Sequence, residues 1–258
     1  EENLIRFKLA PHSHSIPSSE GIEQIEKFKQ WLRFKRYSES TITTYSEALK
    51  TFLVFYRNKA IIDITNEDVI VYNNEYILKN NLSASFQNQT VNAIKLFFMT
   101  IRDTKMMVDK IHRPKRAKVL PNVLSKEEIK LILNAHSNIK HKTMLSLIYS
   151  CGLRRSELLN LKPADIDSKR GIIIIRQSKG KKDRIAPLSP KILEMLREYY
   201  KGYKPKIWLF EGQIENTKYD ERSLSNVLKQ ALTKSKISKP VSLHWLRHSY
   251  ATHLLESG

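Results

Sequence analysis

The sequence predicts a mainly α-helical protein with one small antiparallel β-sheet, divided into two domains. Apolar residues recur at helical spacing through the first hundred residues and again after residue 124. A single pair of strand-like segments, joined by a short basic turn, lies in the second half. The 258 residues, 41% of them hydrophobic, suffice for two packed cores.

Residues 20–108 are predicted to form the first, all-helical domain, after a leader or arm at 1–19. Helical periodicity begins at Gly21. Hydroxyl side chains can cap the next three helices, since such residues accept from free backbone N–H groups. These caps are Ser38 or Ser40, then Thr65, then Ser83 or Ser85.

Residues 109–123 are predicted to be an extended basic linker between the two domains. Arg113, Lys115 and Arg116 surround Pro114, and Pro121 follows. The segment can lie on an anionic partner or be an ordinary solvated connection. Its composition does not separate these two interpretations.

Residues 124–258 are predicted to form the second domain, in which helices surround the small sheet. Ser125 and Glu128 form a capping box that starts its first helix. The strands are predicted at 171–176 and 184–188, around a turn at 178–182. The other helices are predicted at about 139–150, 190–199, 222–234 and 243–256.

The charge of the chain points to a polyanionic partner. Lys and Arg number 45 against 26 Asp and Glu, which gives a net charge of +19. Such a field attracts nucleic acid, an acidic membrane surface or an acidic protein. No apolar run of about 18 residues is present, so no membrane-spanning segment is expected. The single cysteine, Cys151, is consistent with a reducing cytosol and excludes an internal disulfide.

Two pairs of residues at helical spacing, and one lysine, are suited to phosphate chemistry. Glu157 lies one helical turn after Arg154, and Arg247 one turn after His244. Lys179 lies at the tip of the predicted hairpin. Two arginines, a histidine and a lysine can grip a phosphodiester and stabilise its transition state. Taken singly, the Arg–Glu pair could be a surface ion pair and the lysine ordinary turn polarity.

Metal and cysteine chemistry are not expected. His244, His248 and His253 fall in neither a His-Glu-x-x-His pattern nor a site with paired cysteines. Cys151 has apolar neighbours and no evident base, so it is a poor nucleophile.

Three segments, in this order, resemble the motifs of tyrosine recombinases, also called phage-type integrases. Residues 149–158 (YSCGLRRSEL) resemble the first arginine motif, 178–184 (SKGKKDR) the hairpin lysine motif, and 243–255 (LHWLRHSYATHLL) the His-x-x-Arg box. Ser40 and Thr41, followed by Tyr45, resemble the start of the family's core-binding domain. The pattern is most similar to Xer-like and to integron or transposon integrases.

The resemblance implies a two-domain clamp around duplex DNA, built from a helical, SAM-like core-binding domain and an α+β catalytic domain. It implies site-specific cleavage and rejoining through a 3′-phosphotyrosyl intermediate, with no cofactor and no metal. Arg154 and Arg247 would hold the non-bridging oxygens, and His244 would donate or accept a proton. Lys179 would protonate the leaving 5′-oxygen, and Glu157 would orient Arg154.

The resemblance also implies the partners of the chain. These are double-stranded DNA and further copies of the chain, as a dimer on each site and a synaptic tetramer, with no membrane partner. The expected location is the nucleoid in a bacterial cytoplasm. The expected DNA contacts are Thr41, Thr44, Tyr45, Lys95, Arg113, Lys115, Arg116, Lys181, Lys182 and Arg184.

One departure from the family pattern bears on activity. The family's Gly-His motif and tyrosine nucleophile follow the His-x-x-Arg helix, and the printed chain stops at Gly258 before them. Tyr250 stands where the family has an aromatic or apolar core residue, so it is not expected to replace the nucleophile. The chain as printed is therefore expected to bind DNA without cleaving it. The alternatives are a non-cleaving regulator of the same fold and an unrelated basic helical protein that binds RNA or a membrane surface.

Overall fold

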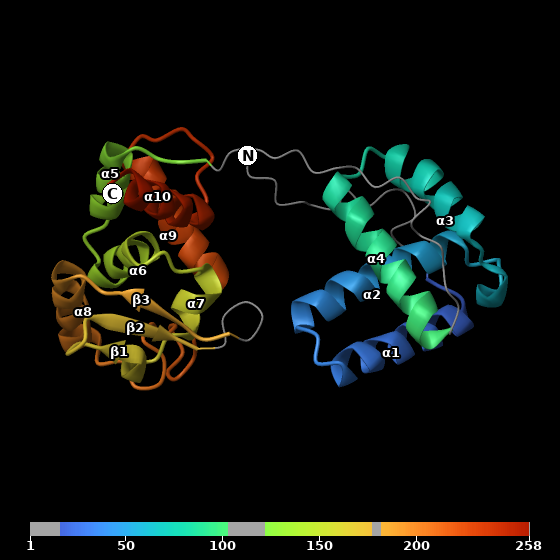
Figure 1. The fold of residues 1–258 in the computed structure, drawn as a ribbon, viewed down its shortest axis with the longest axis horizontal. Coiled ribbons are helices and arrows are strands. Elements are labelled where there is room, and N and C mark those ends of the chain that lie inside the picture. The colour runs from blue at the N-terminus through green and yellow to red at the C-terminus, as the bar shows by residue number, and fades with distance from the viewer. Residues whose placement is uncertain (1–15, 103–121, 177–181, 258) are drawn as a thin grey trace. The chain divides into compact units, whose positions relative to one another are not determined.

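The structure, a computed structural model, describes residues 16–102, 122–176 and 182–257. These residues form two compact units, one made of residues 16–102 and the other of residues from 122 to 257, each of which can be followed by itself in Figure 1. The first unit is all-helical, and the second combines helices with a small sheet. The predicted fold class, mainly α with one small antiparallel sheet, is confirmed. The predicted boundaries of the leader and the linker fall largely on residues outside the described part and stay predictions.

Three helices of the first unit begin at a serine cap, of which Ser38 and Ser83 were predicted and Ser18 was not. Ser18, Ser38 and Ser83 accept hydrogen bonds from backbone N–H groups at the starts of three helices. At the fourth, the carboxylate of Asp68 accepts from the backbone N–H of Thr65 at 2.7 Å. The helices are α1 (Ser19–Phe34), α2 (Glu39–Phe55), α3 (Asn66–Tyr72) and α4 (Ala84–Ile101).

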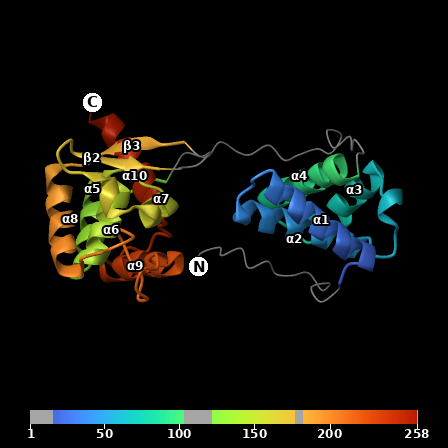
Figure 2. The same cartoon turned by 90° about the horizontal axis from the view of Figure 1, so that it is seen from below.

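The core of the first unit lies among α1, α2 and α4, which pack against one another (Figure 2). Phe28, Phe52 and Phe97 are fully buried there, with the rings of Phe28 and Phe97 edge to face. Two short elements were not predicted: a 3-10 turn (η1, Ile61–Asp63) and a π-helical segment (η2, Asn73–Leu78) that continues α3. The buried side chain of Asn73 accepts a hydrogen bond from Gln87 of α4, so the π-helical segment is tied to the core.

The second unit places a three-stranded antiparallel sheet beside a group of six helices (Figure 1). The strands are β1 (Ile166–Asp167), β2 (Ile172–Ile175) and β3 (Arg184–Pro187), with β2 in the middle. The helices are α5 (Lys126–Asn134), α6 (Ile139–Ser150), α7 (Arg155–Asn160), α8 (Pro190–Tyr203), α9 (Glu221–Lys234) and α10 (Leu243–Glu256).

Helix α6 is the centre of the second core. Met144, Leu145, Leu147 and Ile148 are all fully buried, so the helix is covered on every side over this stretch. It packs against α5, α7, α8, α9 and α10. Because its C-terminal end leads directly into α7, this core holds the α6–α7 corner in place. None of the helices in the described residues is long and apolar enough to cross a membrane.

Two predictions for the second unit need correction: one strand was missed, and one helix is longer than expected. Strand β1 was not predicted. Its two residues pair with β2, Ile166 with Ile173 and Asp167 with Ile172. This pairing depends on the neighbouring strand, so the sequence of β1 itself does not reveal it. Helix α8 continues to Tyr203, beyond the predicted end near residue 199, and Tyr199 is buried against the core.

Candidate active site

The corner between α6 and α7 presents the first arginine motif. Gly152 has a φ of +57°, a left-handed conformation that glycine adopts without strain. This turn places Arg154 at the N-cap of α7 and Glu157 in its first turn. Glu157 accepts from the backbone N–H of Arg154 at 2.8 Å and from its Nη1 at 2.6 Å. The carboxylate therefore fixes both the start of the helix and the direction of the arginine.

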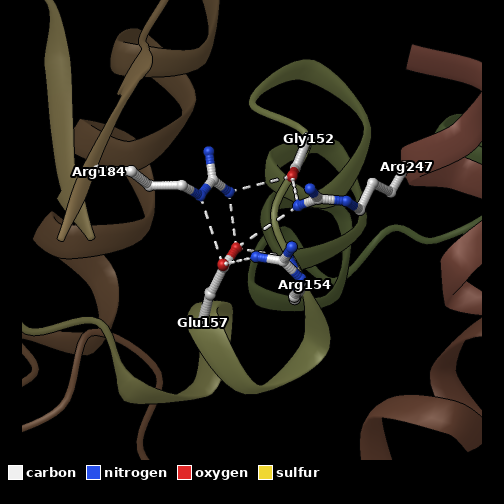
Figure 3. A network of polar contacts seen from close by, with 5 residues as sticks. All are labelled: Gly152, Arg154, Glu157, Arg184 and Arg247. Atoms are coloured by element: carbon white, nitrogen blue, oxygen red, sulfur yellow. Dashed lines mark hydrogen bonds and ion pairs between the residues drawn. The ribbon is translucent and has the colours of Figure 1, made fainter. Parts of the chain in front are cut away.

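Three arginines from three elements converge on this carboxylate (Figure 3). Arg184 of β3 donates to Glu157 through Nη2 at 2.6 Å and through Nε at 3.3 Å. Arg247 of α10 places Nη1 3.6 Å from Glu157 Oε2. Both Arg184 and Arg247 also donate to the carbonyl oxygen of Gly152. The site is therefore held together by one side chain and one backbone carbonyl.

The charges of the cluster do not balance. Within the part of the cluster that the structure describes, one carboxylate faces three guanidinium groups, an excess of about two positive charges at neutral pH. The side chain of Glu157 is only 3% exposed, whereas those of Arg154, Arg184 and Arg247 are 33%, 30% and 28% exposed. The positive groups thus reach solvent and the negative one does not. Such an arrangement attracts an anion such as a phosphate diester.

His244 lies one helical turn before Arg247 on α10 and is exposed. Partial burial and the positive charges of nearby His248, Arg247, Arg155 and Arg154 lower its pKa from the usual 6.5. The same environment lowers the pKa of Arg247, chiefly through burial and through Arg154. The imidazole is therefore neutral at pH 7, so one ring nitrogen can accept a proton.

We expect an NMR titration of the His244 ring to give a pKa below 6.5 that rises in Arg154→Ala, because that change removes a nearby positive charge. The folded-state pKa lies below the unfolded value, so the fold disfavours the protonated ring. The contribution of His244 to the free energy of unfolding is therefore fully present above about pH 6.5. It decreases as the pH falls toward the lowered pKa. An unchanged His244 pKa in Arg154→Ala would contradict this electrostatic coupling.

The predicted site residues are thus brought together unequally. Arg154, Glu157 and Arg247 are in one network, with His244 close enough to be affected by its charges. Lys179 lies outside the described residues.

The predicted DNA contacts are spread over both units. Thr41, Thr44 and Tyr45 lie on α2 and Lys95 on α4, while Lys182 precedes β3. Arg113, Lys115, Arg116 and Lys181 lie outside the described part of the chain. These assignments stay predictions.

Two members of the site were not recognised in the sequence. Arg184 was assigned to DNA contact, but the structure shows it bound to Glu157, 27 residues away along the chain. The carbonyl of Gly152, a backbone group, was not predicted to be part of the site, yet it accepts from Arg184 and Arg247. Both lie within motif segments of the sequence, but the contacts that make them part of the site are tertiary, so no spacing along the chain reveals those contacts.

Cysteine chemistry and metal chemistry have less support at this site than phosphate binding has. Burial raises the pKa of the Cys151 thiol to about 12, so the thiolate is scarce at neutral pH. Across the residues that the structure describes, no three His, Cys, Asp or Glu side chains are grouped so that they could hold a metal ion.

Comparison with known proteins identifies the family. Residues 122–258 match the phage integrase family, and residues 25–107 match the N-terminal SAM-like domain of phage integrases. A tyrosine recombinase of Pseudothermotoga lettingae is 33% identical over 248 residues, which are 91% of this chain and 85% of that protein. The chain therefore belongs to the phage integrase family of tyrosine recombinases.

Solved structures share the fold. The XerH site-specific recombinase in a post-cleavage complex with its palindromic difH substrate has a TM-score of 0.70 at 22% identity, over 91% of this chain and 74% of that one. A lambda integrase tetramer bound to a Holliday junction has a TM-score of 0.69 at 19% identity, again over 91% and 74%. At these identities, the likeness supports the fold alone.

Proposed function

We propose that this site-specific recombinase cleaves and rejoins duplex DNA by transesterification through a 3′-phosphotyrosyl intermediate. The observation that carries the proposal is the convergence of Arg154, Arg184 and Arg247 on a single buried carboxylate, next to a neutral histidine. A pentacovalent phosphate has more negative charge on its non-bridging oxygens than the ground state. Preorganised guanidinium groups stabilise that charge selectively.

In this mechanism a tyrosine oxygen attacks the scissile phosphorus and the bond to the 5′-oxygen breaks. Arg154 and Arg247 hold the non-bridging oxygens, and Glu157 positions both of them. Lys179 donates a proton to the leaving 5′-oxygen, and His244, the proton donor or acceptor beside the phosphate, can take the proton that the attacking tyrosine hydroxyl loses. The phosphotyrosyl bond conserves the energy of the diester, so rejoining requires no ATP and none of the steps needs a metal.

The attacking tyrosine is, in our proposal, none of the eleven tyrosines in the printed chain. The partner is duplex DNA, to which residues of both units and the basic residues Lys115 and Arg116 would contribute contacts. Two copies would occupy one site and four a synapse. The lambda integrase tetramer and the XerH recombinase, which share the fold, are both solved in complexes with DNA.

A direct joining assay tests the chemistry on this chain without requiring its nucleophile. The substrate is a duplex end with a 3′-p-nitrophenyl phosphate, annealed beside a strand with a free 5′-hydroxyl. The 5′-oxygen attacks phosphorus, the bond to p-nitrophenolate breaks, and the hydroxyl proton passes to a base of the protein. We expect joining well above the rate without protein. No acceleration on DNA that the protein binds would instead favour the non-cleaving regulator of the same fold.

Binding to DNA is expected to weaken steeply with salt, because bound cationic side chains release counterions from the phosphates. If roughly six to ten phosphates are neutralised, log K should fall with log salt at a slope of about −5 to −9. Replacing Lys115 and Arg116 of the linker by Ala should flatten the slope by about two units.

The control for the linker variant is a second double substitution, which replaces one lysine and one arginine of the second unit. Lys191 and Arg197 are both exposed on α8. Replacing these two by Ala should leave the slope unchanged in the same fluorescence-anisotropy titrations. Equal slopes for the linker variant and the unchanged protein would mean that the linker does not follow the DNA backbone.

A further inference from the structure

Gly152 lies against an aromatic ring on the side where another residue would have its Cβ. A Cβ built on Gly152 would lie 2.7 Å from Cδ1 and 2.9 Å from Cε1 of Tyr250. Real Cβ atoms do not approach carbon atoms so closely, so the ring already occupies the space that any other residue would need. A glycine is thus required at position 152 for two reasons, the positive φ and the close approach of the Tyr250 ring.

Tyr250 and Arg247 lie one turn apart on α10, on the side that faces the α6–α7 corner. Arg247 donates to the carbonyl oxygen of Gly152, while the ring of Tyr250 packs against its Cα. The same glycine therefore receives two contacts from one helix. A shift of this turn relative to α10 would disturb the carbonyl that holds Arg247 and also Arg184.

The ring of Tyr250 is itself held in place. Tyr149 of α6 meets it edge to face, with ring centroids 6.5 Å apart and an interplanar angle of 81°. The hydroxyl of Tyr149 is 3.0 Å from Nδ1 of His253, one turn beyond Tyr250 on α10. Tyr149 therefore connects α6 to the same segment of α10, just before the corner begins.

We propose that Tyr250 is a positioning residue for the reacting phosphate. Its ring fixes the backbone of Gly152, and the Gly152 carbonyl in turn fixes the guanidinium groups of Arg247 and Arg184. The ring performs this role and the hydroxyl does not, so Tyr250 is not a nucleophile. This inference rests on the proposed function, because it concerns the geometry of the same arginine site.

The direct joining assay separates the ring from the hydroxyl. We expect Tyr250→Phe to join DNA within about twofold of the unchanged protein. Tyr250→Ala should be slower by about tenfold to a hundredfold, since small displacements of catalytic groups cost rates of that order. The affinity for uncleaved DNA should stay within about twofold in both variants. Tyr200→Ala, which removes an exposed tyrosine of α8, is the matched control and should join at the normal rate.

A double-mutant cycle tests whether the effect passes through Gly152. Gly152→Ala should slow joining, and adding Tyr250→Ala to it should cause little further loss, because the two residues share one contact. Defects that multiply would overturn the proposal. So would a Tyr250→Phe variant as slow as Tyr250→Ala, or equal losses of rate and affinity in Tyr250→Ala.

The cycle also distinguishes this inference from the proposed function. If the unchanged protein does not join DNA, the proposed function fails. The coupling of Gly152 and Tyr250 can then still be read from the urea midpoints of the same four proteins. Additive midpoint shifts in that series would overturn the contact itself, and non-additive shifts would support it.

Discussion

Arg154→Ala and Arg247→Ala are each expected to slow the joining of a 3′-p-nitrophenyl phosphate end by a factor of about 100 to 1,000 or more. Each change removes one guanidinium from the site where charge accumulates in the transition state. DNA binding should fall far less, because the total charge of +19 is spread over the chain. The measurements are single-turnover joining at saturating protein and a parallel titration of binding.

Arg197→Ala is the control for loss of an arginine. This side chain is exposed on α8, an element that contributes none of the residues Arg154, Glu157, Arg184 and Arg247. It should join at the normal rate. If Arg154→Ala and Arg247→Ala lost affinity and rate by the same factor, these arginines would serve general DNA binding and the proposed transition-state role would be wrong.

Glu157→Ala is expected to destabilise the second unit by roughly 3 kcal/mol, since removing one partner of a buried ion pair leaves the others uncompensated. Three guanidinium groups would then face one another without this carboxylate between them, while Arg184 and Arg247 keep the Gly152 carbonyl as an acceptor. The value is at the lower end of the usual range because the arginines are about one third exposed and water can relax around them. Joining should be lost as well, because Arg154 and Arg247 lose their common anchor.

Urea unfolding measures the destabilisation caused by Glu157→Ala, provided that the tryptophan fluorescence reports on the second unit alone. Trp208 and Trp245 lie in that unit and Trp31 in the other, so a Trp31→Phe background isolates the signal. Glu157→Gln keeps the shape and an acceptor oxygen and should be destabilised less than Glu157→Ala.

Glu221→Ala provides a matched ion-pair control. Glu221 and Arg155 are also 2.6 Å apart, but their side chains are 53% and 44% exposed. An exposed pair of this kind contributes less than about 1 kcal/mol. Equal destabilisation by Glu157→Ala and Glu221→Ala would show that burial of Glu157 does not matter.

Much of the fold could be predicted because its signals are local. The capping box of Ser125 and Glu128 lies within one helical turn, and both of its hydrogen bonds form as predicted. Helix α6 has its predicted bounds, Ile139–Ser150, and α10 its predicted bounds, Leu243–Glu256. The two-residue strand β1 and the π-helical segment after α3 were missed, because each is stabilised by contacts from elsewhere in the chain.

The sequence by itself determined the family, the mainly helical two-domain fold and the residues of the three motifs. For two of those motifs it could do so because their key residues are three positions apart, a spacing that a helix converts directly into neighbouring side chains. Only the tertiary structure decided which groups hold the site together. Arg247 meets the Gly152 carbonyl across 95 residues and Arg184 meets Glu157 across 27. Contacts over such separations depend on how whole helices and strands pack, and no local pattern of residues encodes them.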